Sequence, residues 1–302
     1  MPQIKANGLD FEYESFGRDG DPAILLIMGF SAQLTMWPVA LCNALAAKGF
    51  RVIRFDNRDV GKSTHLLDKG APNMGELMAA VASGKHPDVP YHLSDMADDA
   101  VGVLKALGIT EAHIVGASMG GMIAQLVAAN HPDVTRSVTS IMSTTGKRDL
   151  PAARPEAMAA LMTPPASTER EDRIKRTINT FRIIGSPGYP ASDAEMRAFA
   201  ERENDRVPYE PTGIARQMAA IVAAPPRNDL LKNVRAPALV IHGADDPLVP
   251  VAGGKDTAAS IPGAELEIVP GMGHDFTDAL LPVYLRLIGE FVSRVEAKAK
   301  AA

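Results

Sequence analysis

Short apolar runs alternate with helix-period stretches over the first half of the chain, and this alternation restricts the fold more than any other feature of the sequence. Ala23–Met28 is a continuous apolar run that ends at Gly29, as expected of a strand buried on both faces. The stretches Val39–Lys48 and Leu93–Leu107 have helical patterns, and each is followed by a glycine. Three further runs read as strands: Arg51–Phe55, Ala112–Gly116 and Val138–Met142. Such alternation predicts an α/β protein with a mostly parallel central sheet flanked by helices.

The rhythm breaks in the middle of the chain. Residues 147–228 contain ten prolines and no strand pattern, while apolar residues recur at helical spacing from Ile174 to Ile184. The regular pattern returns with two strands and a closing helix, at Ala238–Ile241, Leu266–Val269 and Tyr284–Val295. We therefore predict a core in two parts, residues 1–146 and 229–302, with a helical insert at residues 147–228 before the last strands.

The composition is that of a globular protein. With 302 residues, of which 46% are hydrophobic and 22% charged, the chain can bury a large core and is unlike disordered or fibrous sequences. A net charge of -5 gives no basic face for phosphates, so no nucleic acid partner is expected. No apolar run approaches the roughly 20 residues that cross a bilayer, so no membrane span is expected.

Cysteine usage bears on the compartment. Cys42 is the single cysteine, which excludes an internal disulfide and a cysteine-based zinc cluster. This usage fits a reducing cytoplasm, and the first residues lack the apolar stretch of a signal peptide. We expect a cytoplasmic protein. The sequence leaves open whether it forms a homo-oligomer.

One pentapeptide, Gly116-Ala117-Ser118-Met119-Gly120, lies where a predicted strand ends and a helical stretch begins. Strand, sharp turn and helix are the context of a nucleophile elbow. The serine in such a turn has a strained backbone, and small residues two positions before and after it let strand and helix approach closely. The turn holds the serine oxygen beside a helix N-terminus. Ser118 is therefore the candidate nucleophile, and the alternative is a chance match in a glycine-rich loop.

A serine hydroxyl needs a base to take its proton and a carboxylate to orient that base. His274 follows a predicted strand in a glycine-rich segment, residues 270–275, near the C-terminus. This position in the chain order makes His274 the candidate base. His242 ends a strand and is interpreted as a structural hydrogen-bonding residue. The other histidines are interpreted as surface or local structural residues: His65, His86, His92, His113 and His131.

The carboxylate is expected between the serine and the histidine in the sequence. Asp245 and Asp246 follow the strand Ala238–Ile241, and adjacent residues point in different directions, so only one can face His274. We select Asp246 and interpret Asp245 as a turn former. The order serine, aspartate, histidine is that of the α/β-hydrolase fold and differs from the two common protease orders.

Over nearly its whole length the chain resembles α/β-hydrolase-fold serine esterases, and it is similar to the aclacinomycin methylesterase-like branch. The resemblance rests on Leu26-Ile27-Met28-Gly29-Phe30, on residues 54–63, on the serine elbow and on residues 270–274. It implies that the insert at residues 147–228 is a helical cap. In such enzymes the pattern HG-x-x-D-x-x-V-P, which residues 242–250 match, has its acid at the position of Asp246.

The resemblance also implies an oxyanion hole made by the backbone N–H groups of Met119 and Phe30. One departure concerns the second donor. Most of the superfamily has His-Gly in this loop, whereas this chain has Met28-Gly29, as the methylesterase-like branch does. Removing one oxyanion donor typically costs about 3–4 kcal/mol of transition-state stabilisation.

Candidate pocket residues come from two regions. Met36 and Trp37 follow the oxyanion loop closely and are candidates to line the pocket, with a core role as the alternative. Three methionines of the insert are candidates for an adaptable apolar wall over the substrate, with ordinary packing as the alternative: Met158, Met162 and Met218.

No cofactor or metal is expected. The run Gly61-Lys62-Ser63 resembles the end of a phosphate-binding loop, but Asp56 occupies the position of the first glycine, so the N–H cradle cannot form. We interpret Asp56, Arg58 and Asp59 as a structural charge network. No dinucleotide fingerprint and no metal-ligand spacing is present.

The sequence thus predicts a carboxylic ester hydrolase that acts on small to medium esters through an acyl-serine. Alternatives with the same three residues are an esterase of bulky polyketide-like molecules, a cofactor-free perhydrolase, a lactonase or a carbon–carbon bond hydrolase. A different class of function is a small-molecule receptor on the same scaffold, which would bind its ligand with few turnovers.

Overall fold

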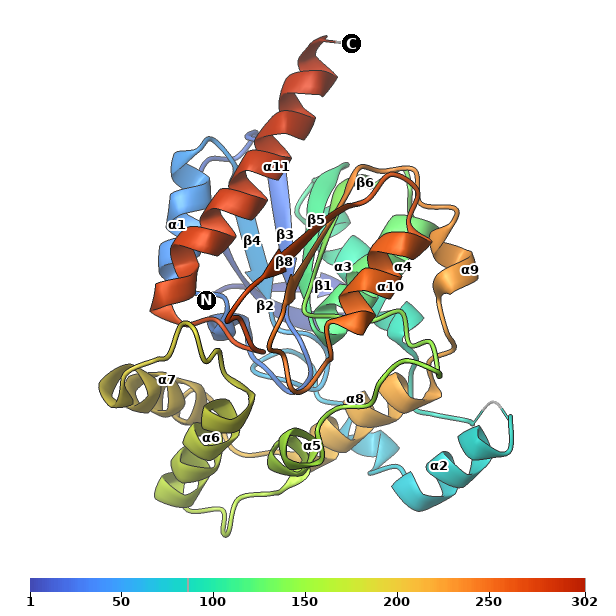
Figure 1. The fold of residues 1–302 in the computed structure, drawn as a ribbon, viewed down its shortest axis with the longest axis vertical. Helices are drawn as coiled ribbons and strands as arrows, with labels where there is room; N and C mark the ends of the chain where they lie inside the picture. Colours follow the sequence, from blue (N-terminus) through green and yellow to red (C-terminus); the bar gives the residue numbers. More distant parts are fainter. Residues whose placement is uncertain (86, 302) are drawn as a thin grey trace.

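The structure, a computed structural model, describes residues 1–85 and 87–301. Its centre is a sheet of eight strands in the order β1-β2-β4-β3-β5-β6-β7-β8 (Figure 1). β1 and β2 are antiparallel to their neighbours, and the other strands are parallel. The predicted mostly parallel sheet is confirmed. The strands are β1 Gln3–Ala6, β2 Leu9–Phe16, β3 Ala23–Ile27, β4 Arg51–Phe55, β5 Ala112–Ala117, β6 Thr135–Ile141, β7 Ala238–Gly243 and β8 Glu265–Val269.

Helices cover both faces of this sheet, as predicted (Figure 1). On one face, the apolar sides of α1 and α11 pack on the strands together with Trp37 and Tyr284. On the other face, α3 and α4 form the larger part of the core and α9 packs beside them. These helices are α1 Val39–Ala47, α3 Leu93–Ala106, α4 Met119–Asn130, α9 Asn228–Leu231 and α11 Leu281–Ala301, and α10 Ala252–Ser260 packs on β7 and β8.

The central pair of strands brings two functional loops together. All residues of β3 and β5 are buried, which explains the uninterrupted apolar sequence of β3 and the mainly apolar sequence of β5, where His113 is the one polar residue. In the parallel register of these strands, Ile27 is paired with Gly116. The loop that follows β3 and the turn that follows β5 therefore start side by side at the carboxyl edge of the sheet.

Between β6 and β7 the described chain forms helices and no strand. Except for α9, which packs beside α4, these helices lie beyond the carboxyl edge of the sheet (Figure 1). They are α5 Pro155–Met162, α6 Arg170–Ile184, α7 Asp193–Asp205 and α8 Pro211–Ala223. We predicted a core of residues 1–146 and 229–302 and a cap of residues 147–228, and this division stays a prediction. The helix α2, Met74–Ala82, belongs to the first core range, yet it packs on α8 of the cap range.

Two elements differ from the sequence-based expectation. The hairpin of β1 and β2 was not predicted, although alternating polar and apolar residues in β2 and the turn Asn7-Gly8, where both φ angles are positive, are local signals for it. The last helix is longer than predicted and continues from Leu281 to Ala301. Over the described residues, none of the helices combines the length and apolar character needed to span a membrane.

Candidate active site

Ser118 forms the turn between β5 and α4 and has a backbone conformation that side chains rarely adopt. Its φ is 56° and its ψ is -120°. A Cβ on Gly116 would overlap the carbonyl oxygen of Gly120, and a Cβ on Gly120 would overlap that of Ile27. Only glycine therefore fits two positions before and two positions after the serine. The strained serine persists because the packing of β3, β5 and α4 fixes the turn.

Backbone bonds fix the position of Ser118. Its N–H donates to the carbonyl oxygen of Ile141 at 2.9 Å, and its own carbonyl oxygen accepts from Ser143 Oγ at 2.8 Å. A Cβ built on Gly29 would lie 3.0 Å from Ser118 Cβ. The loop after β3, which carries Phe30, therefore runs directly alongside the serine. Met119 is the first residue of α4, where a backbone N–H has no acceptor within the helix.

His274 and Asp246 are in direct contact. His274 Nδ1 lies 2.7 Å from Asp246 Oδ2, with side chains that are 8% and 0% exposed. The other carboxylate oxygen of Asp246 accepts from the N–H groups of Leu248 and Val249 at 2.9 and 2.8 Å, which fixes the carboxylate plane. Asp245 instead accepts from Gly271 N at 2.8 Å. Of the two adjacent acids, Asp246 therefore meets the histidine.

Ser118, Asp246 and His274 follow β5, β7 and β8 respectively, so all three emerge at the carboxyl edge of the sheet. A histidine whose Nδ1–H donates to a carboxylate leaves Nε2 free to accept a proton. Proton abstraction from a serine hydroxyl requires a histidine oriented in this way.

The segment that carries His274 is also bound to the C-terminal end of α6. His274 N donates to Ile184 O at 2.8 Å, and Gly273 N donates to Ser186 Oγ at 2.8 Å. The Asp275 carboxylate accepts from Ser186 N at 3.0 Å and from Ser186 Oγ. Burial raises the pKa of Asp275 above its usual value. Sequence reasoning missed Ser186 and Asp275, because nothing in the local pattern of either indicates this contact.

His242 has the environment of a structural residue. Its Nε2 lies 2.7 Å from Val249 O and 3.8 Å from Asp246 Oδ2. Burial lowers its pKa, so the ring is neutral near pH 7 and donates to the carbonyl. It thereby fixes the loop that carries Asp246. His86 lies outside the described residues.

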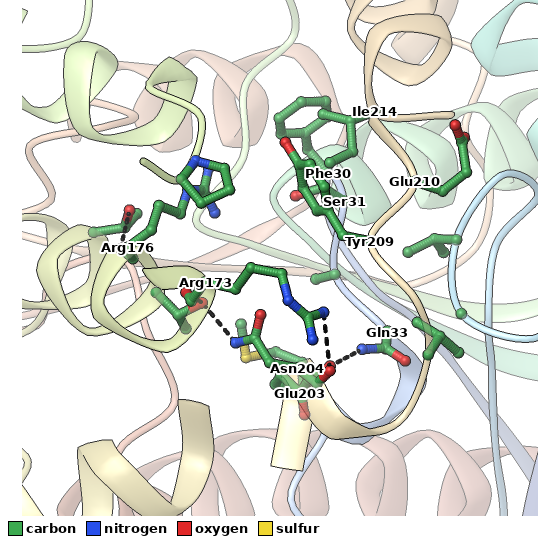
Figure 2. Close-up of a pocket in the computed structure, with 18 of the residues that line it drawn as sticks. Phe30, Ser31, Gln33, Arg173, Arg176, Glu203, Asn204, Tyr209, Glu210 and Ile214 are labelled. Atoms are coloured by element: carbon green, nitrogen blue, oxygen red, sulfur yellow. Dashed lines mark hydrogen bonds between the residues drawn. The ribbon is translucent and has the colours of Figure 1, made fainter. Parts of the chain in front are cut away.

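A cavity opens beside the loop after β3, between the core and helices α6 to α8 (Figure 2). Phe30 and Ser31 form its core side, and Phe181, Phe199 and Ile214 provide apolar surface from the helices. Polar side chains lie among them and come from the loop, from α6 and from the segment between α7 and α8. These polar residues include Gln33, Arg173, Arg176, Glu203, Tyr209 and Glu210.

The structure distributes the predicted pocket residues differently from the expectation. Met36 lines the cavity. Trp37 is fully buried and packs on Phe276, with ring centroids 4.9 Å apart, so it belongs to the core. Met158 and Met162 are 42% and 45% exposed on α5. Met218 is half-buried on α8 and is not among the residues that line the cavity. The apolar wall consists instead of aromatic residues from α6 and α7.

Buried ion pairs connect the loop after β4 to the helical segment. Arg216 of α8 bonds both oxygens of Asp59, at 2.7 and 2.8 Å, and both side chains are fully buried. Arg206 lies 2.8 Å from Asp56. Arg58 bonds Asp99 of α3 at 2.6 and 2.8 Å. The predicted structural charge network therefore exists, and it fixes the helices over the site. Across residues 1–85 and 87–301, no group of three or more His, Cys, Asp or Glu side chains could hold a metal ion.

Fold and sequence together define the class of protein. The chain belongs to the α/β hydrolase fold family, which it matches over residues 22–277, and it is an enzyme of that family. Over 284 residues it is 28% identical to rhodomycin D methylesterase DauP of a Streptomyces species, and the match covers 86% of this chain and 87% of that protein. This confirms the resemblance to methylesterases.

Two further matches extend the comparison. The chain is 27% identical over 281 residues to the 2-hydroxy-6-oxononadienedioate/2-hydroxy-6-oxononatrienedioate hydrolase of Burkholderia vietnamiensis, with 91% of this chain and 88% of that protein covered. The solved structure of the meta-cleavage product hydrolase CumD from Pseudomonas fluorescens superposes with a TM-score of 0.72 at 20% identity, covering 97% of this chain and 98% of that one. The structural likeness concerns the fold.

Proposed function

We propose that this protein is a serine carboxylesterase in which Ser118 is the nucleophile, His274 the general base and Asp246 the residue that orients it. The observation that carries the proposal is the 2.7 Å contact between His274 Nδ1 and Asp246 Oδ2, at the same edge of the sheet as a serine in an elbow turn. The methylesterase among the relatives supports ester hydrolysis as the reaction.

In the proposed mechanism, Ser118 Oγ attacks the ester carbonyl carbon while His274 Nε2 accepts the hydroxyl proton. Asp246 accepts the hydrogen bond from His274 Nδ1–H throughout the reaction and stabilises the imidazolium ion. The backbone N–H groups of Phe30 and Met119 bind the oxyanion of the tetrahedral intermediate. When this intermediate collapses, the alcohol leaves with the proton from His274. Water, activated by the same histidine, then hydrolyses the acyl-serine and restores the free enzyme.

We further propose that residues 147–228 act as a cap that determines the substrate. Support comes from the cavity, since residues of the loops after β3 and β4 form its core side and the other lining residues lie between positions 161 and 214. The mixture of aromatic and polar lining residues suits a small-molecule ester. The methylesterase relatives favour a methyl ester as the reacting group.

The test is hydrolysis of p-nitrophenyl acetate, butyrate, octanoate and laurate by the unchanged protein and by Ser118→Ala. We expect multiple turnovers that the substitution reduces to the background rate. The chain-length optimum will then give the size of the acyl site. Equal rates in both proteins would exclude Ser118 as the nucleophile. Stoichiometric binding of an ester without turnover would favour the receptor alternative.

A further inference from the structure

Two arginines of α6, Arg173 and Arg176, line the cavity that Phe30 also lines. Among the residues that the structure describes, neither has a carboxylate within ion-pair distance. The other six arginines between positions 170 and 216 all have one. These paired residues are Arg170, Arg182, Arg197, Arg202, Arg206 and Arg216.

Arg176 has a structural role that accounts for its position. Its Nε and Nη2 donate to the carbonyl oxygens of Thr163 and Leu161, at 3.2 and 2.6 Å. These carbonyls lie at the C-terminal end of α5, where backbone oxygens lack partners within the helix. Arg176 therefore fixes the end of α5 against α6.

Arg173 is less completely bonded. Its Nη1 donates to Asn204 O at 3.1 Å, while its buried Nε finds no acceptor in the part of the chain that the structure describes. In Figure 2, Arg173 extends from α6 across the cavity toward Gln33. A guanidinium has five N–H donors, and leaving a buried donor without an acceptor costs free energy. The cavity thus contains a cation with unused bonding capacity.

Acidic residues on the cavity wall do not supply the missing charge, because each is bonded elsewhere. Glu210 accepts from Thr212 N and Gly213 N at the start of α8, at 3.1 and 2.7 Å. Asp59 is paired with Arg216. Glu203 lies 3.3 Å from Arg202, and burial raises the pKa of Glu203, which favours its neutral form.

We propose that the cavity binds esters that carry a second, ionised carboxyl group, as in a half-ester of a dicarboxylic acid, and that Arg173 holds this carboxylate. The inference rests on the esterase function proposed above. A planar guanidinium matches a carboxylate with two parallel hydrogen bonds. Phe181, Phe199 and Ile214 provide apolar surface for the carbon chain between the two carboxyl groups. We place the ester end toward Phe30, because the loop that carries Phe30 runs alongside Ser118 at Gly29.

The experiment compares two esters of similar size, 4-nitrophenyl hydrogen adipate and the neutral 4-nitrophenyl hexanoate. The measured quantity is the ratio of kcat/KM for the anionic ester to kcat/KM for the neutral one. We expect Arg173→Gln to lower this ratio by about 10- to 100-fold, the effect typical of losing a hydrogen-bonded charge, and mainly through KM. Arg173→Lys should retain part of the preference for the anionic ester. The matched control is Arg170→Gln. Arg170 lies one turn away on α6 and is paired with Asp205 on the surface, so this substitution should leave the ratio of the two kcat/KM values within about twofold of that of the unchanged protein.

A ratio that Arg173→Gln leaves unchanged would overturn the inference, as would an equal fall for both esters, which would indicate a structural role. A second measurement is independent of turnover. Monomethyl adipate should bind Ser118→Ala in calorimetry, and adding Arg173→Gln should weaken that binding about 10-fold or more. If hydrolysis depends on Ser118 but the ratio does not change, only this inference fails. If neither ester is hydrolysed, the esterase function fails. The carboxylate site is then tested by binding alone, and it is refuted if monomethyl adipate binds equally to Ser118→Ala with and without Arg173→Gln.

Discussion

The backbone N–H of His274 donates to the carbonyl oxygen of Ile184 at 2.8 Å, so the loop with the candidate base is bonded directly to the last residue of α6. Ser186 reinforces this contact, because its hydroxyl accepts from Gly273 N and donates to Asp275. The helical segment thus does more than cover the cavity. It also positions the imidazole, which couples substrate-binding helices to the base.

Ser186→Ala should weaken this coupling. Without the hydroxyl, the buried Asp275 carboxylate loses a donor and Gly273 N loses its acceptor, and we expect a loss of about 1–3 kcal/mol in the free energy of unfolding. We also expect kcat to fall more than KM rises, because the change displaces the base and leaves the cavity intact. Urea unfolding and steady-state kinetics measure the two effects. Ser83→Ala, at an exposed helix end, is the control and should change neither. An unaltered kcat in Ser186→Ala would show that the base does not depend on this bond.

The neighbouring acids Asp245 and Asp246 provide a matched pair for the orienting carboxylate. Asp246→Asn should lower kcat by on the order of 10⁴-fold, the effect of the corresponding change in a serine protease, since the amide favours the wrong histidine tautomer. Asp245→Asn removes only the negative charge of a surface acceptor for Gly271 N, because the amide oxygen can still accept, and we expect less than a 10-fold effect. Hydrolysis of p-nitrophenyl butyrate measures both. If Asp245→Asn lowered kcat more than Asp246→Asn does, Asp245 would be the carboxylate that orients the histidine.

Gly120→Ala tests the close approach of strand and helix at the elbow. The new Cβ would overlap the carbonyl oxygen of Ile27, which is rigid backbone, so we expect a loss of about 3 kcal/mol or more in the free energy of unfolding. Gly75→Ala on α2 is the control. Its Cβ would lie 3.4 Å from Asn73 Oδ1, and its effect should stay within about 1 kcal/mol. Similar stabilities of the two variants in urea unfolding would contradict the packing described for the elbow.

His113 makes the protein sensitive to mild acid. It is fully buried between Ser137 and Glu296, and burial lowers its pKa from 6.5 to about 4. The unfolded chain therefore binds a proton at a pH where the folded protein does not. The contribution of this pKa difference to the free energy of unfolding is therefore fully present above pH 6.5, and it is lost as the pH falls toward 4. Between pH 7 and pH 5 the loss amounts to about 2 kcal/mol.

Urea unfolding at pH 7 and pH 5 measures this loss. We expect His113→Gln to show a smaller pH dependence than the unchanged protein, by about 2 kcal/mol. The comparison variant is His131→Gln, which removes a half-buried histidine beside Asp98 and keeps His113. An identical pH dependence in His113→Gln would mean that other groups cause the acid sensitivity.

Much of the fold and the elbow could be predicted because their signals are local. A strand buried on both faces, such as β3, has an uninterrupted apolar sequence, and the turn around Ser118 requires small residues at fixed positions. The candidate acid and base could be proposed because parallel strands end at one edge of the sheet, so the loops after β7 and β8 meet there. The β1–β2 hairpin was missed although its signal is also local, since Asn7-Gly8 favours a tight turn and polar residues alternate with apolar ones in β2.

The tertiary structure alone decided what surrounds the site. Asp59 and Arg216 are 157 positions apart, and no periodicity predicts their pairing. Met158 and Met162 were candidates for a wall over the substrate, with ordinary packing as the alternative, and they are exposed, while Phe181 and Arg173 line the cavity. Helical spacing shows which residues share a face of a helix, but the face that meets the cavity depends on how α5 to α8 pack on each other and on the core. That packing arises from contacts between distant parts of the chain.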